Sequence, residues 1–434
     1  MNTKTNRSQA AEVRRIGLAF AGLLWLGAIV TQAATTRYVA LGGTNDSAGG
    51  YTSWSGAATN IQLAVNAATN DDTVLVSNGV YMLTNQLSIA TNLTIRSYKN
   101  GAVDRDGTII NGNNFAGKPV TNRCLYLNYT GTLVEGFTIT NGYMWDHGGG
   151  VYVNAGTLRN CLVTGNTAAS NNAFGGGIYA KGSGSLITNC DITGNSVNYG
   201  GAGVYLTTSA QLWNSRLSYN YATNTAGSRG GGVYLASGTF MQNCIVISNT
   251  TVGGGNSFGG GIFFETGTAK NCLVIGNSAY CGGGLYAWFN NSTIDNCTFV
   301  SNRGGRTGID LNSSGHTIRN TIACYNLGSD VIDMLSANYY TNCCFDIVTY
   351  GTTRVYPPWR GSGNIETNNP GFASLAGQNY RLAKGSPCIN RGLNQAWMTG
   401  VSDLDGRQRV DGFSKQVDIG AYEFLPTGTM FLGR

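Results

Sequence analysis

The feature that most constrains this chain is an internal repeat of 23 to 29 residues, which runs from the glycines at 148 to the asparagine at 326. Each copy has a glycine run, a short apolar strand, an asparagine, and a second asparagine six positions later. A fixed period of this length is typical of stacked supersecondary units, each of which buries its apolar face against its neighbours.

Side-chain alternation assigns an inside and an outside to each copy, because residues i and i+2 share a face of a strand. The first and third residues after the glycines are apolar in every copy, from Val151 and Val153 to Ile309 and Leu311. The inward parity breaks across the first asparagine, so the chain turns a corner there and again before the second asparagine. Three short strands and three bends per copy predict an all-β fold, a right-handed parallel β-helix of roughly ten or more coils.

Asparagines at a corner can bond through their amides to the coils above and below. The first asparagines of the copies are therefore predicted to form a structural ladder: Asn160, Asn189, Asn214, Asn243, Asn271, Asn296 and Asn320. A cysteine usually follows, and parity places it in the core, where a free thiol behaves as a small apolar group. Disulfides between neighbouring coils are the alternative. Ser215 and Thr321 at this position in two copies argue against obligatory pairing.

The N-terminal segment, residues 1–33, is predicted to be a signal peptide. Basic residues precede an apolar run over residues 16–30, and Thr31-Gln32-Ala33 offers a cleavage site. An uncleaved membrane anchor is the alternative. The remaining chain has 23 basic and 20 acidic residues, without a basic stripe for nucleic acid and without a later membrane-spanning stretch. A secreted or cell-surface location is expected.

The rest of the chain divides into three parts. Residues 34–72 are predicted to form a strand, a loop and a short N-terminal capping helix, with Ile61, Ala64, Val65 and Ala68 on one helix face. Residues 73–350 form the β-helix, and residues 351–434 form C-terminal coils and a cap, because the ends of a solenoid expose unpaired backbone.

Two stretches resemble known families. The opening around Arg37-Tyr38-Val39 and residues 70–76 resembles bacterial secreted parallel β-helix proteins, a group that includes polysaccharide lyases. The run Asp403-Leu404-Asp405-Gly406-Arg407 with residues 417–423 resembles the choice-of-anchor Q domain of exported bacterial proteins. The repeats are similar to those of polymorphic outer-membrane proteins, which are adhesins. The resemblance implies export and surface location, although no apolar anchor follows the C-terminal motif.

Aromatic residues supply the most distinctive candidate site. Parity places one aromatic residue per coil on the outside of the first strand, and a tryptophan two positions after the last one: Tyr152, Tyr179, Tyr205, Tyr234, Phe263, Tyr286 and Trp288. Such a stripe can stack on sugar rings. The alternative is that the rings stack on one another and stabilise the sheet.

Catalytic signals are sparse by comparison. Carboxylates are too scattered in the repeats for a glycoside hydrolase, and Lys181 and Arg229 do not define a cluster with a base. Asp403-Leu404-Asp405-Gly406 lacks a full calcium motif, so a structural turn paired to Arg407 or Arg409 is favoured and no cofactor is expected. The sequence favours a non-catalytic protein that binds polysaccharide or another surface polymer. A polysaccharide lyase acting on acidic glycans and a purely structural stalk are the alternatives.

Overall fold

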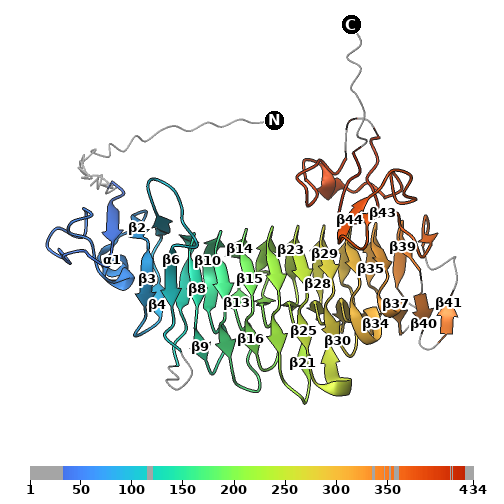
Figure 1. The fold of residues 1–434 in the computed structure, drawn as a ribbon, viewed down its shortest axis with the longest axis horizontal. Helices are drawn as coiled ribbons and strands as arrows, with labels where there is room; N and C mark the ends of the chain where they lie inside the picture. Colours follow the sequence, from blue (N-terminus) through green and yellow to red (C-terminus); the bar gives the residue numbers. More distant parts are fainter. Residues whose placement is uncertain are drawn as a thin grey trace, which may run out of the picture. The chain divides into compact units, whose positions relative to one another are not determined.

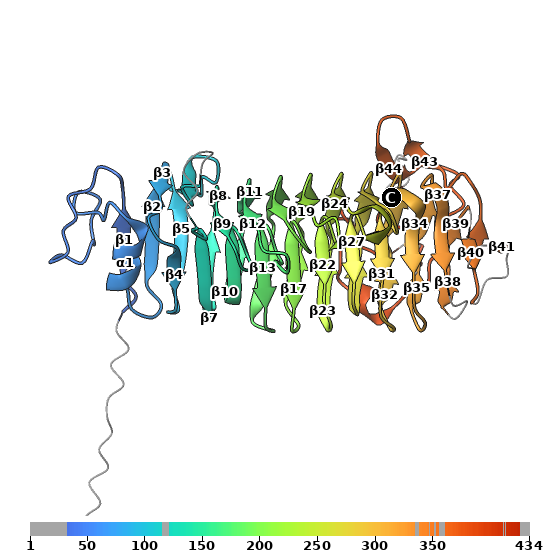
Figure 2. The ribbon, with the colours of Figure 1, turned by 90° about the horizontal axis from the view of Figure 1, so that it is seen from below.

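The computed structural model describes residues 33–114, 121–334, 338–346, 348–350, 353–355, 361–410, 412 and 414–425. The predicted signal peptide lies outside the described residues, apart from Ala33. From Ala34 onward, the strands stack in chain order into a parallel β-solenoid of about ten coils (Figures 1 and 2). The predicted β-helix architecture is confirmed.

Each coil contributes one strand to each of three parallel sheets. Sheet 1 holds the strand that follows the glycines: β4 (Leu87–Ile89), β7 (Leu125–Glu135), β10 (Val151–Arg159), β13 (Ile178–Lys181), β17 (Val204–Thr207), β22 (Val233–Leu235), β27 (Ile262–Phe264), β31 (Leu285–Ala287), β34 (Arg303–Leu311), β37 (Leu327–Asp333) and β40 (Val348–Tyr350).

The long strands β7 and β10 belong to sheet 1 and also continue into sheet 2. Sheet 2 otherwise holds the strand that precedes the first asparagine of each coil: β1 (Thr36–Val39), β2 (Thr73–Ser77), β5 (Thr94–Tyr98), β14 (Ser185–Thr188), β18 (Gln211–Trp213), β23 (Thr239–Gln242), β28 (Gly267–Lys270), β32 (Thr293–Asp295), β35 (Thr317–Arg319) and β38 (Tyr339–Thr341).

Sheet 3 holds the strand between the two asparagines: β3 (Gly79–Met82), β6 (Thr108–Asn111), β8 (Thr138–Thr140), β11 (Leu162–Thr164), β15 (Asp191–Thr193), β19 (Arg216–Ser218), β24 (Ile245–Ile247), β29 (Leu273–Ile275), β33 (Thr298–Val300), β36 (Ile322–Cys324), β39 (Cys344–Phe345) and β42 (Ile365–Glu366).

Short strands after the second asparagine stack in the same way: β9 (Tyr143–Met144), β12 (Thr167–Ala168), β16 (Ser196–Val197), β20 (Tyr221–Ala222), β25 (Thr250–Thr251) and β30 (Ser278–Ala279). In two of the loops that follow, β21 (Ser228–Arg229) pairs with β26 (Ser257–Phe258), just after the 3-10 turn η1 (Gly254–Asn256).

The residues predicted to point inward form one continuous core. Val151, Val153 and their counterparts in the following coils have no exposed surface. All eleven cysteines are buried free thiols. In the five Asn-Cys copies, the thiol donates to the carbonyl two residues earlier at 3.1–3.3 Å. Ser215 and Thr321 donate to the equivalent carbonyl, which explains why a hydroxyl can replace the thiol there.

At each of the two predicted corners, one residue has a left-handed backbone conformation. The first asparagines have φ between 48° and 54°, a region that asparagine tolerates better than other side chains. The second corner is the residue just before the second asparagine, for example Gly165 or Tyr219. These bends separate the strands as the broken parity required.

The continuous asparagine ladder lies in the second column rather than in the first. From Asn166 to Asn326, each amide nitrogen donates to the amide oxygen of the next coil at 2.9–3.0 Å. The first six of these asparagines are at most 1% exposed. In the first column, which the sequence favoured for the ladder, amide bonds join Asn243 to Asn214, Asn271 to Asn243, and Asn320 to Asn296. The side chains of the second column are buried away from water, so their amides must form hydrogen bonds with protein groups.

The predicted N-terminal helix is confirmed as α1 (Ile61–Ala67), which buries Ile61, Ala64 and Val65. Asn60 caps it, because its side chain accepts from the backbone of Gln62. The helix packs against β1, β2 and β4 and covers the apolar lumen of the first coils. In the described part of the chain, no helix is long and apolar enough to cross a membrane.

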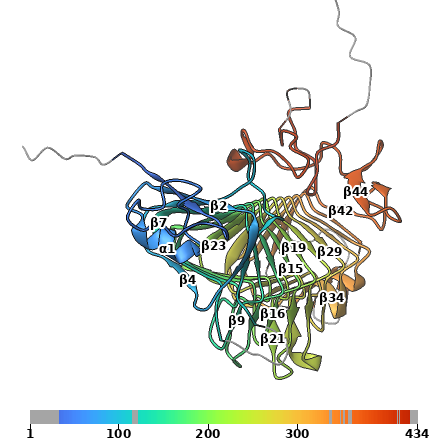
Figure 3. The same cartoon turned by 60° about the vertical axis from the view of Figure 1, so that its left-hand side comes forward.

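The C-terminal segment lies against the side of the solenoid, whereas the sequence placed it as a cap at the end (Figures 1 and 3). We call residues 370–425 the C-terminal layer. It contains the antiparallel pair β43 (Phe372–Ser374) and β44 (Asn379–Leu382) and the 3-10 turn η2 (Ala396–Met398), while β41 (Thr353–Val355) pairs with β40. Tyr380 and Ala421 pack on Leu273 and Val300 of sheet 3.

This placement follows from the outward residues of sheet 3. They are polar in β15 and β19 but apolar, apart from Thr298, from β24 to β36, where Ile245, Leu273, Ile275, Val300 and Ile322 point away from the lumen. An exposed apolar patch of this length is unfavourable in water. The C-terminal layer removes it from solvent, and the last coil extends to β42 at Glu366.

Candidate functional site

The predicted aromatic stripe is a column on the outer face of sheet 1. The parallel pairing sets Tyr152, Tyr179, Tyr205, Tyr234, Phe263 and Tyr286 in register in successive coils. Neighbouring ring centroids are 4.6–5.9 Å apart. The rings therefore stack on one another, and they lie outside the lumen in a cluster separate from the main core. Such contacts stabilise a sheet by a few tenths to about 1 kcal/mol per pair.

The column is open at one end and covered at the other. Tyr152, Tyr179 and Tyr205 are half-buried, whereas Tyr234 and Phe263 are 1% and 0% exposed. The cover consists of side chains from the loops before the glycine runs, mainly Phe174, Arg229 and Phe258. The buried rings cannot touch a ligand, so only the open rings, Trp288 and the covering side chains form an accessible surface.

A groove of about 470 Å³ lies over the covered end of the column. Tyr199, Phe258 and Trp288 supply aromatic walls, and Arg229 stands among them. The remaining lining is mostly amide: Asn171, Asn172, Asn224 and Asn256. Aromatic faces beside amide groups suit a ligand that is apolar on its ring faces and rich in hydroxyls at its edges.

The column continues into a buried carboxyl group. Asp310 follows Tyr286 in register and is 1% exposed, and its two oxygens have no hydrogen-bond partner within the described residues. Burial raises the pKa of Asp310 to about 6, although the charge of Arg306 acts in the opposite direction. The folded protein therefore holds this proton more tightly than the unfolded chain does.

Because the folded pKa lies above the unfolded value, the stability contributed by neutral Asp310 is present below about pH 4 and is lost as the pH rises to about 6. We expect Asp310→Asn to raise the free energy of unfolding at pH 7 by up to about 3 kcal/mol. Urea titrations at pH 4 and pH 7 measure this effect. Equal stability of the two proteins at both pH values would contradict it.

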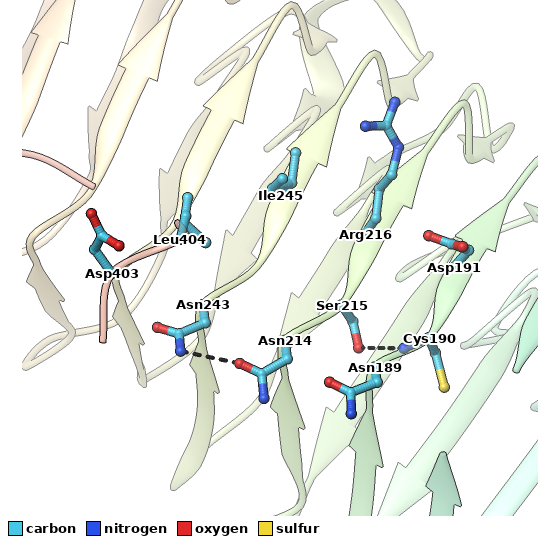
Figure 4. A pocket seen from close by; sticks show the side chains of 10 residues that line it. All are labelled: Asn189, Cys190, Asp191, Asn214, Ser215, Arg216, Asn243, Ile245, Asp403 and Leu404. Carbon is cyan, nitrogen blue, oxygen red and sulfur yellow. Dashed lines mark hydrogen bonds between the residues drawn. The ribbon is translucent and has the colours of Figure 1, made fainter. Parts of the chain in front are cut away.

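A second groove, of about 330 Å³, lies at the boundary between the C-terminal layer and the open part of sheet 3 (Figure 4). Asn189, Asn214 and Asn243 lie in a row along it, and Asp403 comes from the C-terminal layer. Asp191 pairs with Arg105 at 2.7 Å. Arg216 is exposed, and within the described residues it forms no ion pair. This groove is polar and has no aromatic wall.

The other residues considered for catalysis do not converge. Lys181 is exposed. His147 stacks on Tyr179 and its Nδ1 accepts from the backbone of Phe174, whereas His316 is buried. Throughout the described ranges, no group of three metal-ligating side chains is close enough to hold a metal ion.

The Asp403-Leu404-Asp405-Gly406 segment is a structural turn. Asp403 Oδ1 accepts from the backbone N–H groups of Asp405 and Arg407 at 2.8 Å, and its Oδ2 accepts from the backbone N–H of Glu423. The sequence favoured an arginine partner at 407 or 409 for this turn. Asp405 instead pairs chiefly with Arg381 at 2.6 Å, because β44 brings that guanidinium over the turn.

Several site residues were absent from the sequence-based stripe. Tyr126 precedes Tyr152 in the column, and the alternation of Leu125, Tyr126 and Leu127 carried the same signal. Phe174, Tyr199 and Phe258 lie in loops of variable length, where no periodicity predicts a side chain's direction. Only the stacking of those loops brings them over the column.

Comparisons with known proteins agree with this architecture. A family described as "Right handed beta helix region" matches residues 78–279. No curated protein matches the sequence. Among solved structures, pectate lyase Pel9A is 13% identical with a TM-score of 0.51, covering 90% of this chain and 97% of that one.

Two further structures are more distant. XylC in complex with xylose is 9% identical with a TM-score of 0.43, covering 77% of this chain and 86% of that one. ORF18 of Geobacillus virus E2 is 14% identical with a TM-score of 0.32, covering 70% of this chain and 56% of that one. At such identities the likeness to the pectate lyase concerns the fold alone. The chain has a parallel β-solenoid fold, and the part of it that matches the right-handed β-helix family is residues 78–279.

Proposed function

We propose that this protein is an exported or cell-surface protein that binds a polysaccharide chain along the outer face of sheet 1. The observation that carries the proposal is the groove in which Trp288, Phe258 and Tyr199 stand beside amide side chains. The half-buried Tyr152, Tyr179 and Tyr205 extend this aromatic surface over three neighbouring coils.

The geometry supports binding of a polymer better than capture of a small molecule. Beside the groove, Tyr152, Tyr179 and Tyr205 lie in register in successive coils, which are about 4.8 Å apart. An elongated sugar chain can contact several coils at once, and each weak contact then adds to the affinity. Export and surface location remain part of the proposal on the strength of the N-terminal sequence.

Replacing Trp288 with alanine tests the site directly. We expect Trp288→Ala to weaken binding of a recognised polysaccharide by about ten-fold, because the indole offers the largest stacking surface in the groove. Trp213→Ala is the matched control, since Trp213 packs against Phe240 on the outer face of sheet 2, away from the groove. Affinity electrophoresis against alginate, pectin, glycosaminoglycans and neutral glucans measures both variants.

Three outcomes would contradict the proposal. Equal weakening by the two tryptophan variants would show that the groove is not the binding site. An absorbance increase from unsaturated sugars during incubation with alginate or pectin would identify a lyase instead of a binding protein. Absence of binding to any polymer in the panel would favour a structural stalk.

A further inference from the structure

We propose that the groove selects glycans that contain uronic acids, and that Arg229 binds the uronate carboxylate. This inference rests on the proposed function, and it names the class of polysaccharide and the residue that recognises it.

Arg229 stands on an aromatic platform instead of extending into solvent. Its guanidinium carbon is 4.9 Å from the ring centroid of Trp288, 5.3 Å from that of Phe263 and 5.2 Å from that of Tyr199. Stacking against ring faces attracts the cation and holds its plane, but it uses none of the N–H donors. The guanidinium is therefore oriented before any ligand arrives.

The donors of Arg229 have no acceptor within the described part of the chain. Its Nε is buried without a hydrogen-bond partner, and no ion pair links the guanidinium to a carboxylate. Glu265, a carboxylate on the same outer face, accepts the hydroxyl of Tyr234. A half-buried cation without a counter-charge is costly unless a ligand supplies an acceptor.

The backbone around Arg229 is fixed by stacking of the loops. Arg229 pairs in register with Gly200 on one side and with Phe258 on the other. Its N–H donates to Tyr199 at 3.0 Å, and its carbonyl accepts from Gly201 at 2.9 Å. A side chain at Gly200 would meet the rings of Tyr234 and Phe174 and the backbone oxygen of Arg229 within 3.0–3.2 Å, so the loops pack closely here. Such a backbone restricts where a bound anion can lie.

A uronate residue matches these groups one by one. Its ring face can lie on Trp288 or Phe258, and its planar carboxylate can accept two parallel hydrogen bonds from the guanidinium. The amides of Asn172 and Asn256 line the same groove and make no side-chain hydrogen bond within the described residues. They can bond to the sugar hydroxyls.

Isothermal titration calorimetry with polygalacturonate and with its carboxyl-reduced form tests the inference. We expect the wild-type protein to bind the acidic polymer at least ten-fold more tightly than the reduced polymer. Arg229→Gln should remove most of that preference. Arg216→Gln, in the polar groove beside the C-terminal layer, is the matched control and should keep the preference. Arg229→Lys should keep part of it, because the charge remains but the paired hydrogen bonds do not.

The outcomes separate this inference from the proposed function. Equal affinity for the two polymers would overturn the role of the carboxylate and leave polysaccharide binding standing. An equal change in the preference for the acidic polymer in Arg229→Gln and Arg216→Gln would likewise overturn the role of the carboxylate. Failure of both polymers to bind, together with the rest of the panel, would overturn both proposals. Arg229-dependent binding of dextran sulfate without binding of polygalacturonate would show that the groove prefers sulfate, which also contradicts the inference.

Discussion

Replacing Asn249 with alanine is expected to lower the free energy of unfolding by roughly 3–5 kcal/mol. The Asn249 amide donates to Leu217, Ile247 and Asn277, and its oxygen accepts two bonds from Asn220. The side chain has no exposed surface, so water cannot replace these bonds. The substitution leaves backbone and amide groups of two neighbouring coils unsatisfied in the core. Urea-induced unfolding followed by far-UV circular dichroism measures the loss.

Asn243→Gly is the matched control for this prediction. Asn243 belongs to the first asparagine column of the same coil, is half-buried, and makes two amide bonds to its neighbours. Glycine accepts its φ of 54° without strain, and water can reach the amides that remain. A loss within about 1 kcal/mol is expected. If the two variants lower the free energy of unfolding by similar amounts, the buried ladder does not stabilise the fold more than the first asparagine column does.

The second large effect is expected in the C-terminal layer, where Arg409→Met should lower the free energy of unfolding by roughly 3–5 kcal/mol above about pH 8. The Arg409 side chain is fully buried and donates to Glu423 at 2.7 Å and to the carbonyl of Gly420 at 2.9 Å. Burial raises the pKa of Glu423 to about 8, although the charge of Arg409 lowers it. Above about pH 8, where Glu423 ionises in the wild-type protein, loss of Arg409 would leave that carboxylate buried without a counter-charge or force it to bind a proton. Hydrogen exchange across residues 380–425 should show the loss as faster opening of this layer.

The pH dependence identifies the cause of that loss. A carboxyl group with a raised folded pKa stabilises the fold in acid, and this contribution disappears as the pH rises through the folded pKa. The cost of Arg409→Met should therefore be smallest near pH 4 and largest above pH 8. Arg381→Met is the control, because Arg381 pairs with Asp405 while its side chain is 43% exposed. It should cost at most about 1 kcal/mol at any pH. A loss for Arg409→Met that does not vary with pH would contradict the charge-based account.

The periodic part of the fold was predictable because strand parity is a local property. Val151 and Val153 could be placed inside, and Tyr152 outside, from their spacing alone. The same reasoning could have placed the C-terminal layer. Ile245, Leu273 and Val300 alternate with the lumen residues and so must face outward, where only a covering segment can bury them. The choice of ladder column was harder, because both asparagine columns lie next to corners.

The sequence by itself determined the solenoid, its capping helix and the aromatic column, because each depends on residues at fixed short separations. Only the tertiary structure decided which rings are accessible, where Arg229 stands, and which residues of the C-terminal layer contact sheet 3. Those features depend on loops of different lengths that stack coil on coil, and on contacts between segments more than a hundred residues apart, such as Thr298 with Ala421. No local pattern encodes distances of that kind, since they are set by the packing of the whole stack.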